Sequence, residues 1–355
     1  MLELNGLLLK LYNSLSAWFT SIGVPLIWLN ILVMIFAAAV ILAVISICVL
    51  FLVWWERKIS AHIQDRLGPM YVGGWHGWAQ TIADFLKLLF KEDIVPDSSD
   101  KTLFKMAPYL AFLGAFAAFV VLPFGAASFV SDLNIGILYV LAVGSLSVVG
   151  IIMAGWASNN KYSLYGGMRA AAQVISYEIP AAIAIMTVII PVGSLSMVAI
   201  VQAQKGGFLN WFLFRNPFAF MAFIVYFIAS LAEVNRTPFD IPEAESELVA
   251  GYHTEYSGLR FGFFFLAEFT NMFLVAAVAT TLFLGGWTQI LPGSYELLPG
   301  PVMFFLKALV LIFAQMWLRW SLPRLRVDQL MYVSWKVLLP LSFVLVLGAG
   351  WLAVY

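Results

Sequence analysis

The sequence is poor in charged residues, in cysteine and in histidine. Of its 355 residues only 11% are charged and 63% are hydrophobic, whereas a soluble globular domain has about 25% charged residues. This composition predicts an integral membrane protein. The formal net charge is zero, so bulk electrostatics gives no reason to expect a nucleic-acid partner.

The scarcity of metal-binding residues limits the chemistry that the chain can perform alone. One cysteine and three histidines are too few for an iron–sulfur cluster or a structural zinc site of the usual kind. Cys48 lies inside an apolar run and is interpreted as a packing residue. The sequence contains no GxGxxG motif and no P-loop. We therefore expect no metal and no bound cofactor, so that another chain carries any electrons.

Long hydrophobic runs dominate what is present. Eight of them approach or exceed the roughly 20 residues that a helix needs to cross a bilayer. They lie near residues 28–54, 104–124, 136–156, 171–192, 217–234, 261–284, 302–320 and 335–354. Fifteen of the 19 Lys and Arg residues fall in or beside the loops after the odd-numbered spans, and three lie on the other side. The positive-inside rule then places both termini outside and the charged loops in the cytoplasm.

The predicted fold is therefore all-α, a single membrane domain over residues 1–355 with eight transmembrane helices and amphipathic lateral helices. Residues 1–24 mix Leu with polar residues, which suggests a helix lying on the membrane or leading into it. The cytoplasmic loop 55–103 predicts a second amphipathic helix. This helix either rests on the bilayer or walls a cavity at the membrane surface. Its polar stripe consists of Gln80, Asp84, Lys87 and Lys91.

Three carboxylates lie in or at the end of the predicted spans. Glu178 lies in the fourth span, Glu233 ends the fifth, and Glu268 lies in the sixth. On the predicted topology Glu178 and Glu268 are roughly 10 Å deep from the cytoplasmic side. An ionisable residue in a span costs roughly 2.5–3.5 kcal/mol to insert and usually marks an ion or proton path. The alternative is a set of protonated acids satisfied by neighbouring backbone.

The second cytoplasmic loop, 235–260, is rich in acids. Pro238 and Pro242 exclude a regular helix across 237–242, so we expect a structured loop that clusters its carboxylates. A solvated acidic loop is the alternative. Lys307, inside the seventh span, is interpreted as snorkelling toward the outer side, with a proton-path lysine as the alternative.

Four segments resemble a single family. They read AEVNRTPFDIPEAESELVAGYHTEYSG followed by FFFLAEFTNM, ERKISAHIQDRLGP followed by ADFLKLLFKED, SNNKYSLYGGMRAAAQVISYEIP, and PRLRVDQLMYVSWKVLLPLS. These motifs look like the signature of the membrane-embedded H subunit of proton-pumping NADH–quinone oxidoreductase, the NADH dehydrogenase subunit 1 family of respiratory complex I. The resemblance runs from about residue 40 to the C-terminus. It departs at 68–74, where GPMYVGG replaces the usual GPNRVGP of relatives, so that the Asn, the Arg and the second Pro are missing.

The resemblance implies a subunit at the heel of the membrane arm, with eight spans and both termini outside. It implies a quinone-binding chamber and a chain of buried acids that couples quinone reduction to proton translocation. The implied proton-coupling residues are Glu178, Glu233, Arg236, Asp240, Glu243, Glu245, Glu247, Glu255 and Glu268. The implied quinone-chamber residues are Glu56, Arg57, Lys58, Arg66, Asp84, Phe239, Arg324 and Arg326.

The resemblance also implies the surroundings of the chain. The substrate is ubiquinone or menaquinone, while NADH, FMN and iron–sulfur clusters are on partner subunits. Those partners are the quinone-site hydrophilic subunits, the iron–sulfur subunits, the small A, J and K membrane subunits, and the antiporter-like subunits, all surrounded by membrane lipids. The implied location is the bacterial inner membrane, or the mitochondrial inner membrane for an organellar chain. The alternatives are a homologous subunit of a membrane-bound hydrogenase, an independent proton or cation transporter, and a structural anchor.

Overall fold

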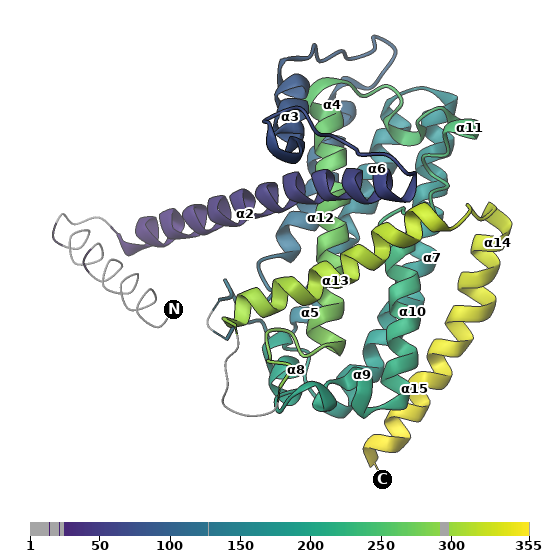
Figure 1. The fold of residues 1–355 in the computed structure, drawn as a ribbon. Helices are drawn as coiled ribbons and strands as arrows, with labels where there is room; N and C mark the ends of the chain where they lie inside the picture. The colour runs from purple at the N-terminus through teal and green to yellow at the C-terminus, as the bar shows by residue number, and fades with distance from the viewer. Residues whose placement is uncertain (1–13, 15–20, 22–24, 127, 292–297, 355) are drawn as a thin grey trace. The chain divides into compact units, whose positions relative to one another are not determined.

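The computed structural model describes residues 14, 21, 25–126, 128–291 and 298–354, without the side chains of Glu245 and Ser246. These residues form helices (Figure 1), and the only strand-like pairing among them is an isolated bridge between Gly125 and Ser128. The prediction of an all-α chain is confirmed. The helix predicted for residues 1–24 falls almost wholly outside the described residues. The chain divides into two compact units, Met1–Cys48 and Val49–Tyr355.

The helices follow one another along the whole described chain. In order they are α2 Leu26–Ile63, η1 Trp75–Gly77, α3 Gln80–Phe90, α4 Lys101–Ala118, α5 Gly136–Gly144, α6 Leu146–Ala157, α7 Lys161–Val192, α8 Met197–Ala203, η2 Phe208–Asn210, α9 Phe212–Arg215, α10 Pro217–Glu233, α11 Glu245–Leu248, η3 Gly251–His253, α12 Gly258–Phe283, α13 Gly300–Ser321, α14 Val327–Tyr332, η4 Val333–Leu338 and α15 Leu339–Val354. The helix α3 coincides with the predicted amphipathic helix in loop 55–103.

Six stretches of the described residues are long and apolar enough to cross a membrane. They are Leu26–Ile63, Gly136–Ala157, Lys161–Val192, Gly258–Phe283, Gly300–Ser321 and Val327–Val354. The remaining two predicted spans correspond to α10, which is apolar but has 17 residues, and to α4, which begins with two lysines in five residues. The helix α7 contains the fourth predicted span and begins ten residues before it, at Lys161.

Polar side chains set the starts of α4 and α7. Asp100 accepts hydrogen bonds from the backbone N–H groups of Thr102 and Leu103, at 3.1 and 3.3 Å, before α4. Asn160 accepts one from the backbone N–H of Tyr162 at 2.9 Å, before α7. Each side chain satisfies backbone donors that have no partner inside the helix. The cap at Asn160 marks where α7, the helix that carries Glu178, begins.

Small residues let the central helices approach closely. A Cβ added to Gly150 on α6 would lie 2.5 Å from the backbone nitrogen of Ala111 on α4. Such close backbone contact between helices is typical of membrane proteins. The helix α7 packs against α6, α10 and α15 (Figure 1).

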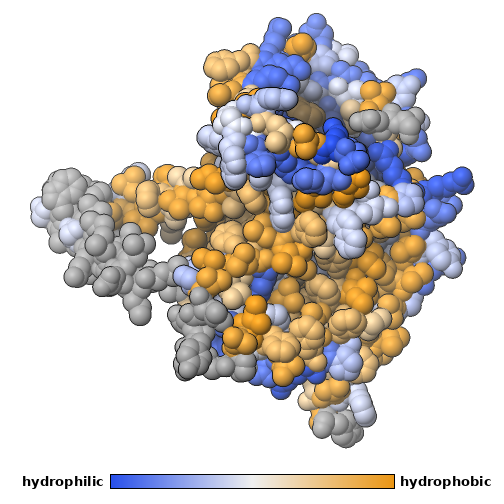
Figure 2. Space-filling view, in the orientation of Figure 1, coloured by the Kyte–Doolittle hydropathy of each residue, from blue (hydrophilic) through white to orange (hydrophobic). Residues whose placement is uncertain are grey.

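Hydrophobic and hydrophilic residues are separated on the surface of the second unit. Figure 2 shows hydrophobic residues over the middle of the visible face, where α13, α10 and α15 lie, and hydrophilic residues around α3 at the upper end. The exposed hydrophobic side chains include Val310 and Phe313 on α13 and Val344 and Leu347 on α15. A continuous apolar face of this kind fits contact with lipid.

Candidate functional site

The most deeply buried charge in the described chain is Arg236, just after α10. Its side chain is 2% exposed. Nη1 donates to Oε1 of Glu56 at 2.6 Å, and Nε lies 2.9 Å from Oε1 of Glu268. The guanidinium also lies over the ring of Phe269, 4.6 Å from its centroid. One cation therefore joins the end of α2 to α12.

A second arginine completes this arrangement. Arg319, near the end of α13, forms an ion pair with the same oxygen of Glu56. We call Glu56, Arg236, Glu268 and Arg319 the Arg236 cluster. Burial opposes the charged form of Arg236, but the carboxylates around it outweigh this effect and raise the pKa of its guanidinium. The two carboxylates therefore hold the guanidinium in its charged form.

The acidic loop, residues 235–257, is held against α7. The Nε2 atom of Gln173 donates to the backbone oxygens of Ala232 and Phe239, at 2.8 and 2.7 Å, and to Oδ1 of Asn235 at 3.0 Å. A Cβ on Gly166 would lie 2.6 Å from the backbone nitrogen of Tyr252. These contacts confirm a structured loop, with no regular helix across 237–242.

Glu243 is a half-buried acid of this loop. Tyr252 donates its hydroxyl to Oε1 of Glu243 at 3.2 Å, and Nδ1 of His253 lies 3.7 Å from the same oxygen. Burial raises the pKa of Glu243 well above its usual range, and the charges of Glu268 and Asp240 raise it further. Burial also lowers the pKa of His253 to about 4. At neutral pH this corner of the site therefore holds a neutral imidazole beside a carboxyl group that favours protonation.

The structure does not bring all the predicted acids together. Glu247 is exposed and pairs with Arg169, while Glu255 accepts a hydrogen bond from Nδ2 of Asn160 at 2.5 Å. The side chain of Glu245 lies outside the described residues. Asp240 is buried beside the Arg236 cluster and accepts from Nη2 of Arg324 at 3.0 Å.

Two cavities are lined by acids of the predicted spans. A cavity of about 70 Å³ is lined by Glu178 and Glu233, and a second of about 30 Å³ is lined by Glu233 and Glu268. Glu178 and Glu233 are half-buried and make no hydrogen bond to other residues that the structure describes. Buried polar groups without protein partners are usually satisfied by water, and both cavities are large enough to hold it. The three predicted span acids thus border one pair of water-sized spaces.

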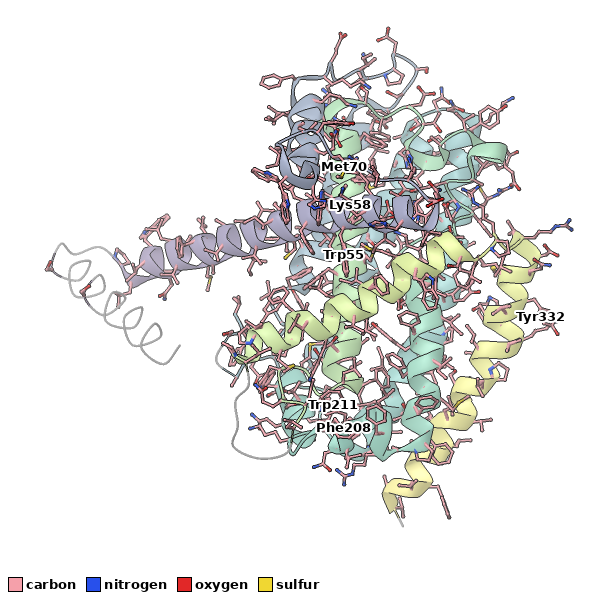
Figure 3. The ribbon with its side chains drawn as sticks, viewed as in Figure 1. Trp55, Lys58, Met70, Phe208, Trp211 and Tyr332 are labelled. Atoms are coloured by element: carbon pink, nitrogen blue, oxygen red, sulfur yellow. The ribbon has the colours of Figure 1, made fainter. Side chains whose placement is uncertain are left out.

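Three predicted quinone-chamber residues, Glu56, Arg57 and Lys58, lie together near the end of α2. Arg57 forms an ion pair with Asp84 of α3. Buried Lys58 donates from Nζ to the backbone oxygen of Pro69 at 2.6 Å and lies 3.0 Å from the sulfur of Met70 (Figure 3). The unusual 68–74 segment is therefore fastened to α2 by a lysine.

Three other predicted chamber residues are placed differently. Arg66 and Arg326 are exposed, and the backbone N–H of Arg326 donates to the side chain of Gln329 at 3.2 Å, at the start of α14. Phe239 is buried against Tyr177, with ring centroids 5.1 Å apart. Their part in a chamber stays a prediction.

Lys307 does not snorkel, so that expectation is wrong. Its side chain is buried, and Nζ donates to the backbone oxygens of Leu284, Gly286 and Thr288 at 2.8 to 2.9 Å. It also lies over the ring of Trp211, 4.0 Å from the centroid. The ammonium group is drawn inward because these carbonyls follow the end of α12 and have no helical partners.

Sequence reasoning missed residues that the structure places at the site. They are Gln173, which fastens the acidic loop, Arg319, which completes the Arg236 cluster, and Asn271 and Ser147, which line both cavities. A polar residue inside an apolar span was the available signal for Gln173, Asn271 and Ser147. Among the residues that the structure describes, no group of three or more His, Cys, Asp or Glu is arranged to hold a metal ion.

Comparison with known proteins gives consistent matches over most of the chain. The NADH dehydrogenase family matches residues 36–349. The H subunit of the NADH-quinone oxidoreductase of Chlorobaculum parvum is 53% identical over 351 residues, which cover 95% of this chain and 98% of the relative. The protein of the same name from Geobacillus kaustophilus is 49% identical over 317 residues, or 89% of this chain and 93% of the relative.

Proposed function

The chain belongs to the NADH dehydrogenase family, and from this premise we propose that it is the membrane-embedded H subunit of an NADH–quinone oxidoreductase. The enzyme is a multi-subunit complex with quinone as its substrate. Partner subunits carry the redox centres, because this chain has too few cysteines and histidines to do so. The names of the relatives favour this complex over the hydrogenase-type and transporter alternatives.

One observation supports our proposal that this chain couples quinone reduction to proton translocation. Arg236 contacts Glu56, an implied quinone-chamber residue, and Glu268, an implied proton-coupling residue. The two sets of residues therefore meet on a single buried guanidinium. A change of charge on the chamber side acts directly on the cation that stabilises the Glu268 carboxylate.

Quinone reduction supplies such a change of charge. Two electrons from a partner subunit and two protons convert the quinone into a quinol, and the electrons add negative charge until protons arrive. A unit charge about 10 Å from Arg236 interacts with it by about 1.7 kcal/mol at an effective dielectric constant of about 20. That energy corresponds to more than a tenfold change in a proton-binding equilibrium, since about 1.4 kcal/mol is tenfold.

The proton route that we propose follows the two cavities. A proton exchanged at Glu268 passes through the smaller cavity to Glu233, and through the larger cavity to Glu178. Glu233 is the intermediate proton acceptor and donor on this route because it lines both cavities. Water inside the cavities supplies the hydrogen bonds along which protons move.

The proposed topology keeps eight spans with both termini outside. The helices α4 and α10 complete the set, and α10 is about 26 Å long from its 17 residues, slightly less than the hydrocarbon core. The charged end of the molecule, with α3 and the acidic loop, then faces the cytoplasm and the hydrophilic partner subunits. The membrane is the bacterial inner membrane, with the small and antiporter-like membrane subunits alongside.

The function is tested on the complex that contains this chain. An affinity tag on the chain should isolate an assembly that reduces quinone with electrons from NADH. Glu56→Gln should lower quinone reduction while leaving reduction of a water-soluble acceptor such as ferricyanide unchanged, because that acceptor does not use the chamber. An assembly without quinone reductase activity would overturn the proposal.

The proton route has a separate test. The double variant Glu178→Gln and Glu233→Gln should assemble and should lose proton translocation, since an amide cannot take up a proton. Wild-type translocation in the double variant would refute the route.

A further inference from the structure

The two cavities beside the span acids share four lining residues. These are Ser147, Val174, Glu233 and Asn271. They lie where the two cavities adjoin, between Glu268, which lines the smaller one, and Glu178, which lines the larger one. Glu233 is the only titratable group among the four, so the other three determine whether water can bridge to it.

Asn271 is the residue at this boundary with the most hydrogen-bonding capacity to offer water. An amide has two donors and an acceptor oxygen. The amide of Asn271 is half-buried and forms no hydrogen bond with the rest of the described chain. Its polar atoms therefore need water as a partner, because a buried polar group is normally hydrogen-bonded.

The other two shared residues cannot replace Asn271. Val174 is apolar. Ser147 donates its hydroxyl to the backbone oxygen of Gly144 at 2.7 Å, so only its acceptor lone pairs remain for water. Asn271 alone combines donor and acceptor at the boundary.

The position of Asn271 on α12 supports the same role. It follows Glu268 by three residues in one continuous helix, so the two side chains share a face about one turn apart. Both line the smaller cavity. The helix thus presents an acid and an amide in series toward Glu233.

We propose that Asn271 is a positioning residue that holds the water linking Glu268 to Glu233. The amide does not itself titrate, and it acts by orienting water that accepts and donates the proton. The proton moves from the Glu268 carboxyl to this water and from the water to the Glu233 carboxylate, with no net change at the amide. The inference rests on the proposed proton route.

The test uses the assembled complex in proteoliposomes with a pH-sensitive dye. Asn271→Leu replaces the amide with an apolar side chain of similar size and should lower proton translocation by about tenfold, less than the roughly 100-fold or larger effect of a group that itself transfers the proton. Coupled quinone reduction should show a larger solvent deuterium isotope effect, because proton transfer becomes slower. Asn271→Ser, which keeps a donor and an acceptor, should restore most of the translocation.

Matched variants separate the outcomes. Thr270→Val changes the neighbouring residue on α12, whose hydroxyl donates to the backbone oxygen of Leu266 at 2.6 Å, and should keep both the rate and the isotope effect. If Asn271→Leu does not assemble, Asn271→Ala removes the amide without added bulk and should still raise the isotope effect. Wild-type translocation and isotope effect in the assembled Leu or Ala variant would overturn the inference.

Glu233→Gln in the same assay distinguishes failure of the proposed proton route from failure of the proposed role of Asn271. Loss of translocation in Glu233→Gln with normal translocation in Asn271→Leu would leave the route intact and refute the role of Asn271. Normal translocation in Glu233→Gln would refute the route and the inference together.

Discussion

Arg236→Met should destabilise the protein strongly, because it removes the cation that two buried carboxylates share. Glu56 keeps Arg319 as a partner, but Glu268 loses the one ion pair that the described structure gives it. The side chains of Arg236 and Glu268 are only 2% and 15% exposed. Breaking a buried pair by removing one partner costs about 3–5 kcal/mol, since the remaining charge is left uncompensated.

The assay is the apparent melting temperature of the complex, with Arg169→Met as the matched control. Arg169 pairs with a Glu247 side chain that is 59% exposed. An exposed pair contributes only about 0.2–1 kcal/mol, so the control should melt close to the wild type while Arg236→Met melts several degrees lower.

A double variant tests the reason for the loss. Arg236→Met combined with Glu268→Gln also removes the carboxylate that Arg236→Met leaves without its ion pair. The double variant should recover part of the lost stability, because substitutions at neighbouring residues are coupled. Equal melting of the single and double variants, or of Arg236→Met and the control, would refute the reasoning.

Three further predictions concern stability, measured in each case as the melting temperature of the assembled complex. Lys307→Met leaves three buried backbone oxygens without their donor and should lower the free energy of unfolding by about 3 kcal/mol. The control, exposed Lys205→Met, should have little effect. Similar melting temperatures of the two variants would count against a structural role for Lys307. Gln173→Leu removes two hydrogen bonds to the acidic loop, at Asn235 and Phe239, and one to Ala232 near the end of α10. It should cost about 2–3 kcal/mol, whereas the control, exposed Gln202→Leu, should have little effect. His253 has its pKa lowered to about 4 by burial, so between that pH and about 6.5 the unfolded chain binds a proton that the folded chain does not, and stability falls as the pH falls. His253→Gln should therefore lose about 2–3 kcal/mol less than the wild type between pH 6.5 and 4.5, and parallel pH curves would contradict this assignment.

The sequence predicted the helices well because the apolar runs are long and their ends carry clear signals. Asn160 and Gly193 bound α7 as a capping side chain and a left-handed glycine. The helix α7 extends ten residues before the predicted span, over residues 161–170, and it packs on α6 and on η3 of the acidic loop.

The grouping of the acids could not be predicted in the same way. Glu243 and Glu247 are four residues apart, yet one is half-buried beside Tyr252 and the other is exposed. The distinction depends on the loop being fastened to α7, which involves residues far apart in the sequence. The inward direction of Lys307 likewise depends on carbonyl groups about twenty residues earlier.

The central claim is that Glu233 passes protons between the two cavities when quinone is reduced. It is tested most directly by NADH-driven quinone reduction and proton uptake in proteoliposomes, with the wild-type complex beside an assembled Glu233→Gln complex. We predict that the variant loses both proton translocation and coupled turnover while NADH oxidation with ferricyanide stays normal. Wild-type turnover and translocation in Glu233→Gln would contradict the claim and leave Glu233 as a structural acid.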